Sequence, residues 1–167
     1  MADYKAIVTG GARGIGYAIT SALLEAGGKV CFLDISAREG VKAQRDLDEK
    51  YGSGKAVFLQ CDVSNKNELR DAFHEAKSRM SGLNVLCNNA GVEFDEDEIT
   101  RSDEMISINV GGVINGSMLG LELMGKGSGG DGGVIINSSS IGGMSPFKQD
   151  LNSFMTILRP YPVACDD

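Results

Sequence analysis

The chain has 167 residues, 42% of them hydrophobic and 23% charged, so we expect one folded domain with a sizeable core rather than a disordered chain. Its 16 basic and 23 acidic side chains give a net charge of −7, which disfavours nucleic acid as a partner. No apolar run reaches the ~20 residues that cross a bilayer, and the amino terminus lacks a signal-peptide pattern. The prediction is a cytoplasmic protein with no membrane partner.

The first strand is predicted at residues 5–9, and further short apolar runs rich in β-branched residues follow it along the chain. These predicted strands lie at 29–34, 55–62, 84–89 and 133–138. Because the runs are almost continuously apolar, we expect them to be covered on both faces, as in a parallel sheet. Such strands alternating with helices predict an α/β fold of the doubly wound Rossmann type.

Four stretches with helical period separate the strands, at 15–26, 36–51, 65–80 and 102–124. The first is predicted to bury its apolar side chains, which are Ile15, Ala18, Ile19, Ala22, Leu23 and Ala26. The third begins with Asn65 and Glu68 in capping-box register and is predicted to bury Leu69, Ala72, Phe73 and Ala76. Glycines in the last stretch either weaken that helix or allow close packing against a neighbour.

The sequence offers no metal site and no disulfide framework. Cys31, Cys61, Cys87 and Cys165 form no Cys-x-x-Cys pair, and we interpret them as small buried side chains of a reducing compartment. The single histidine, His74, lies on a polar helical stretch and is predicted to be exposed. No metal cofactor is therefore expected.

Acidic side chains concentrate between residues 93 and 104, where Arg101 is the one basic residue. The acids there are Glu93, Asp95, Glu96, Asp97, Glu98, Asp103 and Glu104. We interpret the stretch as a solvated acidic loop, with a cation or partner site as the alternative.

A glycine-rich turn between the first strand and the first helix predicts a phosphate-binding loop. Its candidate residues are Gly10, Arg13, Gly14, Ile15 and Gly16. Glycines let backbone amides approach a pyrophosphate, and the helix N-terminus adds positive potential, although a tight turn alone would explain the same residues. Asp34, at the end of the second strand, can accept hydrogen bonds from ribose hydroxyls and would repel a 2′-phosphate. Arg13 would attract that phosphate, but on balance the residues favour NAD over NADP.

Four motifs in this order resemble the short-chain dehydrogenase/reductase family over residues 5–146. They are the turn at 9–16, Cys-Asp-Val at 61–63, Asn-Asn-Ala-Gly at 88–91 and Ile-Asn-Ser-Ser-Ser at 136–140, which Gly142 follows. Within the family, the likeness is strongest to the branch that contains insect-type alcohol dehydrogenases and hydroxyprostaglandin dehydrogenases. The resemblance implies that Cys61, Asp62 and Val63 lie by the adenine. It also implies that the cofactor is lined by residues 88–91, which include Asn88, Asn89, Ala90 and Gly91.

The resemblance also implies two catalytic residues. Ser140 would hydrogen-bond the substrate oxygen, and Asn109 would hold a water in the proton path. Without the family, serines at 138–140 would be interpreted as turn or helix caps, and Asn109 as an ordinary helical amide. The implied activity is hydride transfer between NAD and a secondary alcohol or ketone, with a hydroxyprostaglandin-like or other lipid alcohol among the substrates considered.

The catalytic Tyr-x-x-x-Lys pair of the family is expected about 13 residues after Ser140, where this sequence has Ser153 and Ile157. We therefore expect an incomplete NAD-binding domain at 1–146, truncated after the fifth strand, and a divergent tail at 147–167. Turnover is predicted to be weak or absent. A non-catalytic dinucleotide-binding fragment or subunit is the main alternative, and a methyltransferase is a remoter one. Partners could be a second copy or a full-length homologue.

Overall fold

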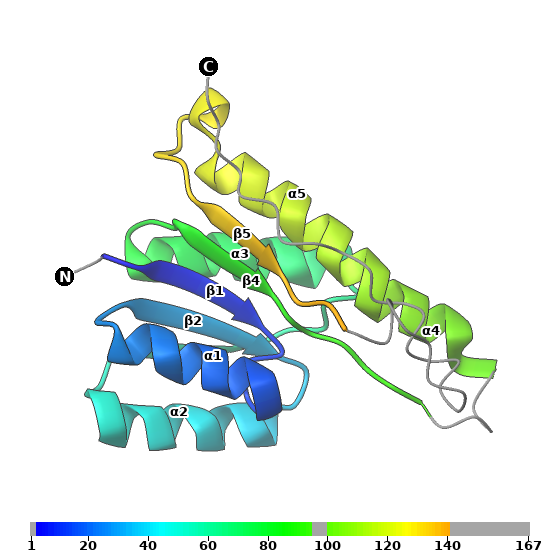
Figure 1. The fold of residues 1–167 in the computed structure, drawn as a ribbon, viewed down its shortest axis with the longest axis horizontal. Coiled ribbons are helices and arrows are strands. Elements are labelled where there is room, and N and C mark those ends of the chain that lie inside the picture. Colours follow the sequence, from blue (N-terminus) through cyan, green and yellow to red (C-terminus); the bar gives the residue numbers. More distant parts are fainter. Residues whose placement is uncertain (1–2, 95–99, 141–167) are drawn as a thin grey trace.

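The computed structural model describes residues 3–94 and 100–140, and a five-stranded parallel sheet forms their centre (Figure 1). Its strands are β1 (Lys5–Thr9), β2 (Lys29–Asp34), β3 (Ala56–Gln60), β4 (Val85–Asn88) and β5 (Val134–Asn137). They lie in the order β3-β2-β1-β4-β5. The predicted strands are confirmed, although three of them were given one or two residues too many at each end. The proposed boundary between residues 146 and 147, and the tail beyond it, lie outside the described residues.

Helices cover both faces of the sheet, which confirms the doubly wound α/β prediction. On one face α1 (Gly14–Glu25) and α2 (Ala37–Tyr51) pack on the β1–β3 side. On the other face α3 (Lys66–Met80) and α5 (Gly112–Met124) pack on the strands (Figure 1). Alternate strand residues supply the two cores, so Val8 and Phe32 point to one face while Ile7 and Leu33 point to the other.

The predicted helix at 102–124 is interrupted by a π-helical turn. α4 (Ser102–Ile106) continues into the π-helix Ser107–Gly111 and then into α5, and a 3₁₀ turn, Lys126–Ser128, follows. The glycines of α5 pack closely against the sheet. A Cβ at Gly120 would lie 2.8 Å from Leu86 and 3.1 Å from Ile135. The close-packing interpretation of these glycines is therefore confirmed.

The predicted buried face of α1 is wrong. Gly16, Thr20 and Leu24 are its buried residues, whereas Ile15 is 74% exposed. Space on this side of the helix is small, because a Cβ on Gly16 would overlap the Gly10 carbonyl oxygen and a Cβ on Gly11, in the preceding turn, would lie 3.2 Å from the Thr20 hydroxyl. Thr20 can be buried there because its hydroxyl donates to the Gly16 carbonyl oxygen over 2.9 Å. The larger side chains of Ile19 and Leu23 are displaced to the flank and are half-buried.

α3 begins as its sequence predicts, with one difference in the cap. The Asn65 side chain accepts from the backbone N–H groups of Asn67 and Glu68. The Glu68 carboxylate accepts from the Asp62 amide over 3.1 Å and from the Asn65 side chain. Glu68 therefore ties the helix to the end of β3 instead of closing back on the Asn65 amide. All four predicted core residues of α3 are buried.

The described cysteines are buried free thiols, as predicted, and Cys165 lies outside the described residues. Burial raises the pKa of Cys31 and Cys61 to about 12 and that of Cys87 to about 11. His74 is exposed. No group of three or more metal-ligating side chains occurs within 3–94 and 100–140. In the same ranges, no helix has the length and apolarity needed to span a membrane.

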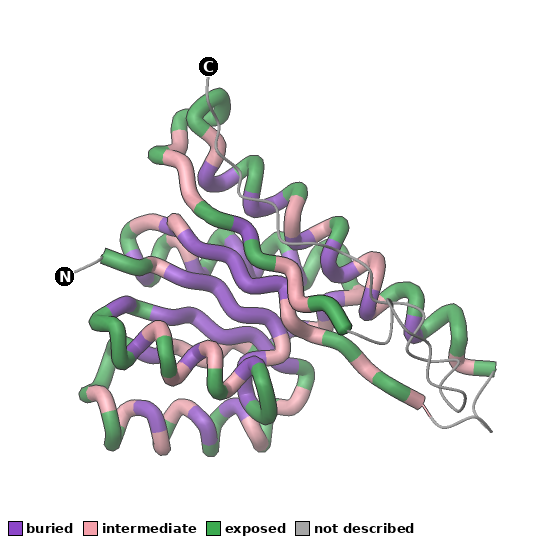
Figure 2. The backbone as a smooth tube through the Cα atoms, viewed as in Figure 1, coloured by how far each residue is buried: buried purple, intermediate pink, exposed green. Residues whose placement is uncertain are grey.

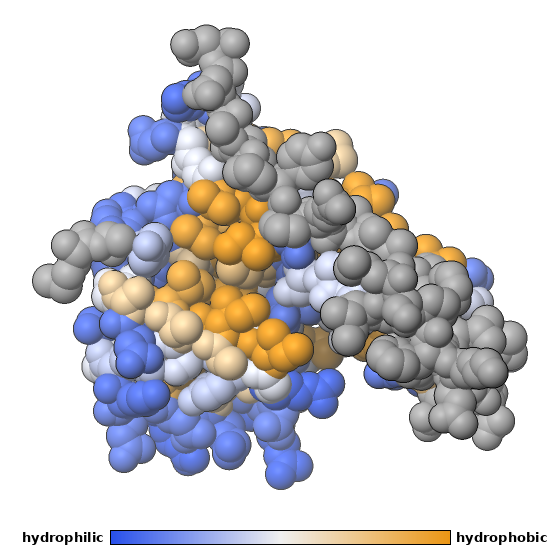
Figure 3. Space-filling view, in the orientation of Figure 1, coloured by the Kyte–Doolittle hydropathy of each residue, from blue (hydrophilic) through white to orange (hydrophobic). Residues whose placement is uncertain are grey.

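β5 forms one edge of the sheet in the described part of the chain. Val134 and Ile136 are the register partners of Val85 and Cys87 and point to the face that α1 and α2 cover further along the sheet. No described helix packs on β5 there, and the two side chains are 44% and 41% exposed. Figure 3 shows apolar surface on this side of the molecule, and the half-exposed course of β5 is visible in Figure 2.

Candidate functional site

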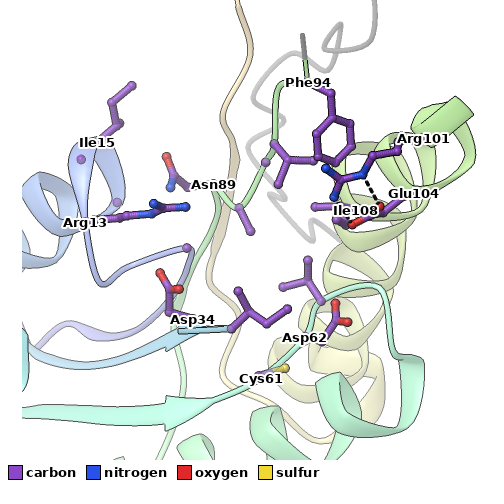
Figure 4. A pocket seen from close by; sticks show the side chains of 18 residues that line it. Arg13, Ile15, Asp34, Cys61, Asp62, Asn89, Phe94, Arg101, Glu104 and Ile108 are labelled. Carbon is purple, nitrogen blue, oxygen red and sulfur yellow. Dashed lines mark hydrogen bonds and ion pairs between the residues drawn. The ribbon is translucent and has the colours of Figure 1, made fainter. Parts of the chain in front are cut away.

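A cavity of about 540 Å³ opens at the carboxyl ends of the strands (Figure 4). It lies where the strand order reverses, because β1 is followed by β2 on one side and pairs with β4 on the other. Such a switch point is where open parallel sheets bind ligands. The structure brings all twelve predicted cofactor residues to this cavity: Gly10, Arg13, Gly14, Ile15, Gly16, Asp34, Cys61, Asp62, Val63, Asn89, Ala90 and Gly91.

The glycine-rich turn presents bare backbone to the cavity. Gly14 has φ of +54°, and a Cβ built on it would meet no atom within 4 Å, so the space above it is open. At Gly16 a Cβ would overlap the Gly10 carbonyl oxygen, which is why the turn can close so tightly. Arg13 is the N-cap of α1, and its side chain makes no capping hydrogen bond. The first amides of the helix are therefore available to an anion.

Asp34 connects the turn to the end of β2. Its carboxylate accepts the Ala12 amide over 3.1 Å and the Ser36 amide over 3.0 Å. The residue is only 7% exposed, yet it lines the cavity. Because a carboxylate offers about four acceptor positions, two remain for further donors. This structural role in fixing the turn was not part of the sequence prediction.

The Cys-Asp-Val run carries the cavity wall from β3 toward α3. One carboxylate oxygen of Asp62 accepts both the amide and the hydroxyl of Ser64, over 2.9 and 2.7 Å. Val63 is buried against α5, where a Cβ on Gly112 would lie 3.0 Å from it. Burial, reinforced by the nearby carboxylates of Glu68 and Asp62, holds the Cys61 thiol protonated.

The Asn-Asn-Ala-Gly run after β4 is held by Thr9 at the end of β1. The Thr9 hydroxyl accepts the amides of Asn89 and Ala90, each over 3.0 Å, and the Thr9 carbonyl accepts the Asn89 side chain over 3.2 Å. Asn88 instead points to β5 and α5, where it donates to Asn137 over 2.9 Å and to Ser117 over 3.1 Å. The run therefore bonds to the backbone and side chains of neighbouring strands and also forms part of the cavity wall.

A second hollow of about 340 Å³ adjoins the first and contains both predicted catalytic residues. Ser140 and Asn109 line it, together with Ser138 and Ser139. Ile15 and residues 89–92 line both hollows, so the two are adjacent and share a wall. The Ser138 hydroxyl donates to the Asn89 side-chain oxygen over 3.2 Å, which connects the end of β5 to the shared wall.

Asn109 lies in the π-helical turn and is 8% exposed. Its amide group donates to the Val92 carbonyl oxygen and accepts the Val92 amide, both over 2.8 Å. This pair joins the segment after β4 to the helix. π-Helical turns inside α-helices occur frequently at functional sites because they shift which side chains point inward. The role of Asn109 in a proton path stays a prediction.

Six lining residues of the cavity were not among the predicted site residues: Ile35, Val92, Phe94, Arg101, Glu104 and Ile108. Arg101 donates to the Glu104 carboxylate through Nε over 2.9 Å and Nη2 over 3.0 Å, and its guanidinium lies 3.7 Å from the Phe94 ring centre. One signal was present in the sequence, since Arg101 is the single cation of the acidic stretch 93–104. The acids at 95–98 lie outside the described residues.

Comparison with known proteins agrees with this architecture. A family model for the short chain dehydrogenases matches residues 4–151. 15-Hydroxyprostaglandin dehydrogenase of Rattus norvegicus, whose name carries NAD(+), is 44% identical over 86% of this chain and 53% of its own length. 3-Beta-hydroxysteroid dehydrogenase of Comamonas testosteroni is 31% identical over 86% of this chain and 55% of its own length.

A solved structure from Novosphingobium aromaticivorans, named as a short-chain dehydrogenase, superposes with a TM-score of 0.78 at 28% identity. The match covers 92% of this chain and 61% of that one. The chain spans about half the length of the curated relatives it matches. On the family match and the shared fold, this chain belongs to the short-chain dehydrogenase family.

Proposed function

We propose that this chain binds NAD in the larger cavity and receives a secondary alcohol or ketone in the adjoining hollow. The observation that carries the proposal is the convergence of the glycine turn, Asp34 and the runs at 61–63 and 89–91 on one cavity of about 540 Å³. That volume lies within the usual range for cofactor and ligand sites. A relative whose name carries NAD(+) supports the choice of cofactor.

The residues present fit a dinucleotide. The open space at Gly14 and the uncapped amides after Arg13 suit a pyrophosphate, which needs backbone donors and close approach. Asp34 has acceptor capacity left for ribose hydroxyls, and its charge would repel a 2′-phosphate, so NAD is favoured over NADP. The runs at 61–63 and 89–91 would hold the adenine and the remainder of the cofactor. When bound, NAD supplies the acceptor for a hydride that leaves the alcohol carbon.

In the smaller hollow, Ser140 would donate a hydrogen bond to the substrate oxygen and Asn109 would support the proton path. As the hydride leaves, the hydroxyl proton must pass to a base, and a tyrosine with an ordinary pKa near 10 is a poor base at pH 7 without a nearby cation. The sequence carries Ser153 and Ile157 where the resemblance expects Tyr and Lys, and both lie outside the described residues. A hydroxyprostaglandin-like or other lipid alcohol is the proposed substrate class.

This substitution of the expected base favours a second candidate function, a dinucleotide-binding fragment or subunit with little turnover. We expect the 167-residue chain to turn over secondary alcohols at least ~10²-fold more slowly than a relative with the Tyr/Lys pair, which is the lower end of a general-base contribution. Initial rates of NADH formation with a panel of secondary alcohols measure this. A rate equal to that of such a relative would refute the expectation.

Cofactor binding is tested by isothermal titration calorimetry of the purified chain with NADH, beside a near-ultraviolet circular dichroism spectrum that reports fixed tertiary packing. We expect saturable heat with NADH and weaker binding of NADPH. If well-folded protein gives no heat with either dinucleotide, the proposed function is wrong. Competition with S-adenosylmethionine distinguishes the methyltransferase alternative, because that ligand is expected to leave NADH binding unchanged.

A further inference from the structure

One wall of the larger cavity contains an arginine side chain stacked on an aromatic ring. The guanidinium of Arg101 lies over the ring of Phe94, and both residues line the cavity with Glu104 and Ile108 (Figure 4). The stack faces the glycine turn and Asp34 across the cavity. None of these side chains is needed for the pyrophosphate or ribose contacts described above.

The geometry of the stack is fixed by Glu104. Nε and Nη2 of Arg101 donate to the two carboxylate oxygens of Glu104, and this two-bond contact along one edge holds the plane of the guanidinium in one orientation. These hydrogen bonds also lower the pKa of Glu104. A ligand carboxylate or phosphate that approached this Nε–Nη2 edge would have to compete with Glu104 for the same donors. What the stack offers the cavity is a flat surface.

The position of the stack identifies the part of a dinucleotide that would meet it. Phe94, Arg101 and Glu104 line the larger cavity together with Asp62 and Val63, and none of the three lines the second hollow. Apolar side chains of Ile35, Val63 and Ile108 line the same cavity. Apolar lining beside a planar cation suits an aromatic base, and a purine is the aromatic base of an adenine nucleotide.

We propose that Arg101, oriented by Phe94 and Glu104, stacks on the adenine of the bound cofactor and contributes to selecting an adenine nucleotide. The inference rests on the proposed function, because it needs an adenine nucleotide in this cavity. Stacking on the base requires a flat guanidinium group, and a positive charge alone is not sufficient. Arg101 is therefore a binding residue for the base, and the pyrophosphate is held independently by the turn.

The test measures ADP-ribose affinity by calorimetry on the full chain, with Arg101→Met and Arg101→Lys as variants. Lys keeps the positive charge but lacks the planar guanidinium group. Met has a long side chain but lacks both the charge and the planar group. Arg79→Met is the matched control, because Arg79 also donates through Nε and Nη2 to a carboxylate, that of Glu75, on the exposed side of α3. Urea unfolding of each variant shows whether the fold is retained.

We expect both Arg101 variants to bind ADP-ribose about fivefold to thirtyfold more weakly, the equivalent of about 1–2 kcal/mol. Arg79→Met is expected to stay within about twofold of the parent chain. Unchanged affinity in Arg101→Met overturns the inference, and so does full affinity in Arg101→Lys, which would assign the effect to charge. If the parent chain itself binds no ADP-ribose, the proposed function fails and this inference fails with it.

Discussion

Replacing Thr9 by Val is predicted to destabilise the chain at the junction of β1 and the cavity wall. Thr9 is 2% exposed, and Val has nearly the same shape, so packing is retained while the hydroxyl is lost. That hydroxyl accepts the amides of both Asn89 and Ala90. The substitution therefore leaves two backbone donors without their acceptor.

The magnitude follows from the two amides. An unsatisfied buried donor costs about 1–3 kcal/mol, and because Asn89 and Ala90 are half-buried beside a cavity, the lower end applies to each. We expect Thr9→Val to lower the free energy of unfolding by about 2 kcal/mol. NADH affinity should fall as well, since the 89–91 wall loses its attachment to β1.

Thr20→Val is a matched control for this prediction. Thr20 is fully buried like Thr9, but its hydroxyl donates to the Gly16 carbonyl oxygen, which stays within the helical hydrogen-bond pattern of α1 when the hydroxyl is removed. We expect its loss to cost no more than about 1 kcal/mol. Urea unfolding followed by circular dichroism gives the free energy of unfolding of each variant, and the two are comparable when the dependence of that free energy on urea concentration is the same. If Thr9→Val is no less stable than Thr20→Val, the reasoning about orphaned amides is refuted.

Three further predictions concern the turn, the cofactor and the thiols. Gly16→Ala should abolish NADH binding and lower stability because its methyl group overlaps the Gly10 carbonyl oxygen, whereas Gly127→Ala, with open space around it, should bind NADH normally by calorimetry. Asp34→Ser should narrow the preference for NADH over NADPH. If the ratio of the NADPH and NADH dissociation constants does not change, Asp34 does not contact the ribose hydroxyls as proposed. In a Cys165→Ser background, a thiol reagent should react slowly with folded protein at pH 8 and fast after unfolding. Burial raises the thiol pKa of Cys31, Cys61 and Cys87 in the folded chain. Between pH 9 and about 11 the unfolded chain therefore loses thiol protons that the folded chain keeps, and the urea concentration at the midpoint of unfolding should fall as pH rises.

The sequence predicted the strands well because glycines and polar residues mark where several of them begin or end. Gly10 and Gly11 follow β1, and Gly27 and Gly28 precede β2, and the bounds of both strands agree with the structure. The glycine turn and Asp34 were predicted from the residues themselves, whereas the runs at 61–63 and 89–91 were predicted from the family resemblance; all of them follow carboxyl ends of parallel strands, which lie at one edge of the sheet. Motifs that are far apart in the chain therefore meet without any long-range information beyond the strand order.

Features that depend on close packing were not predictable in the same way. Hydrophobic periodicity assigned Ile15 to the core, but the buried positions of α1 are Gly16 and Thr20, whose polar burial depends on a hydrogen bond that hydropathy does not register. Arg101 was interpreted as part of a solvated acidic loop, since charge patterning gives sign and not geometry. Its stacking on Phe94 arises only when the segment after β4 folds back on α4.

The wall formed by residues 89–92 joins the two halves of the site. Thr9 holds its beginning to β1, and Asn109 holds its end to the π-helical turn. Since this wall lines both hollows, a change at either attachment should alter cofactor and substrate binding together. The stack of Arg101 on Phe94 lies beyond the wall, so its loss should affect the adenine half alone. The two classes of variant therefore separate the positioning of the whole site from recognition of the base.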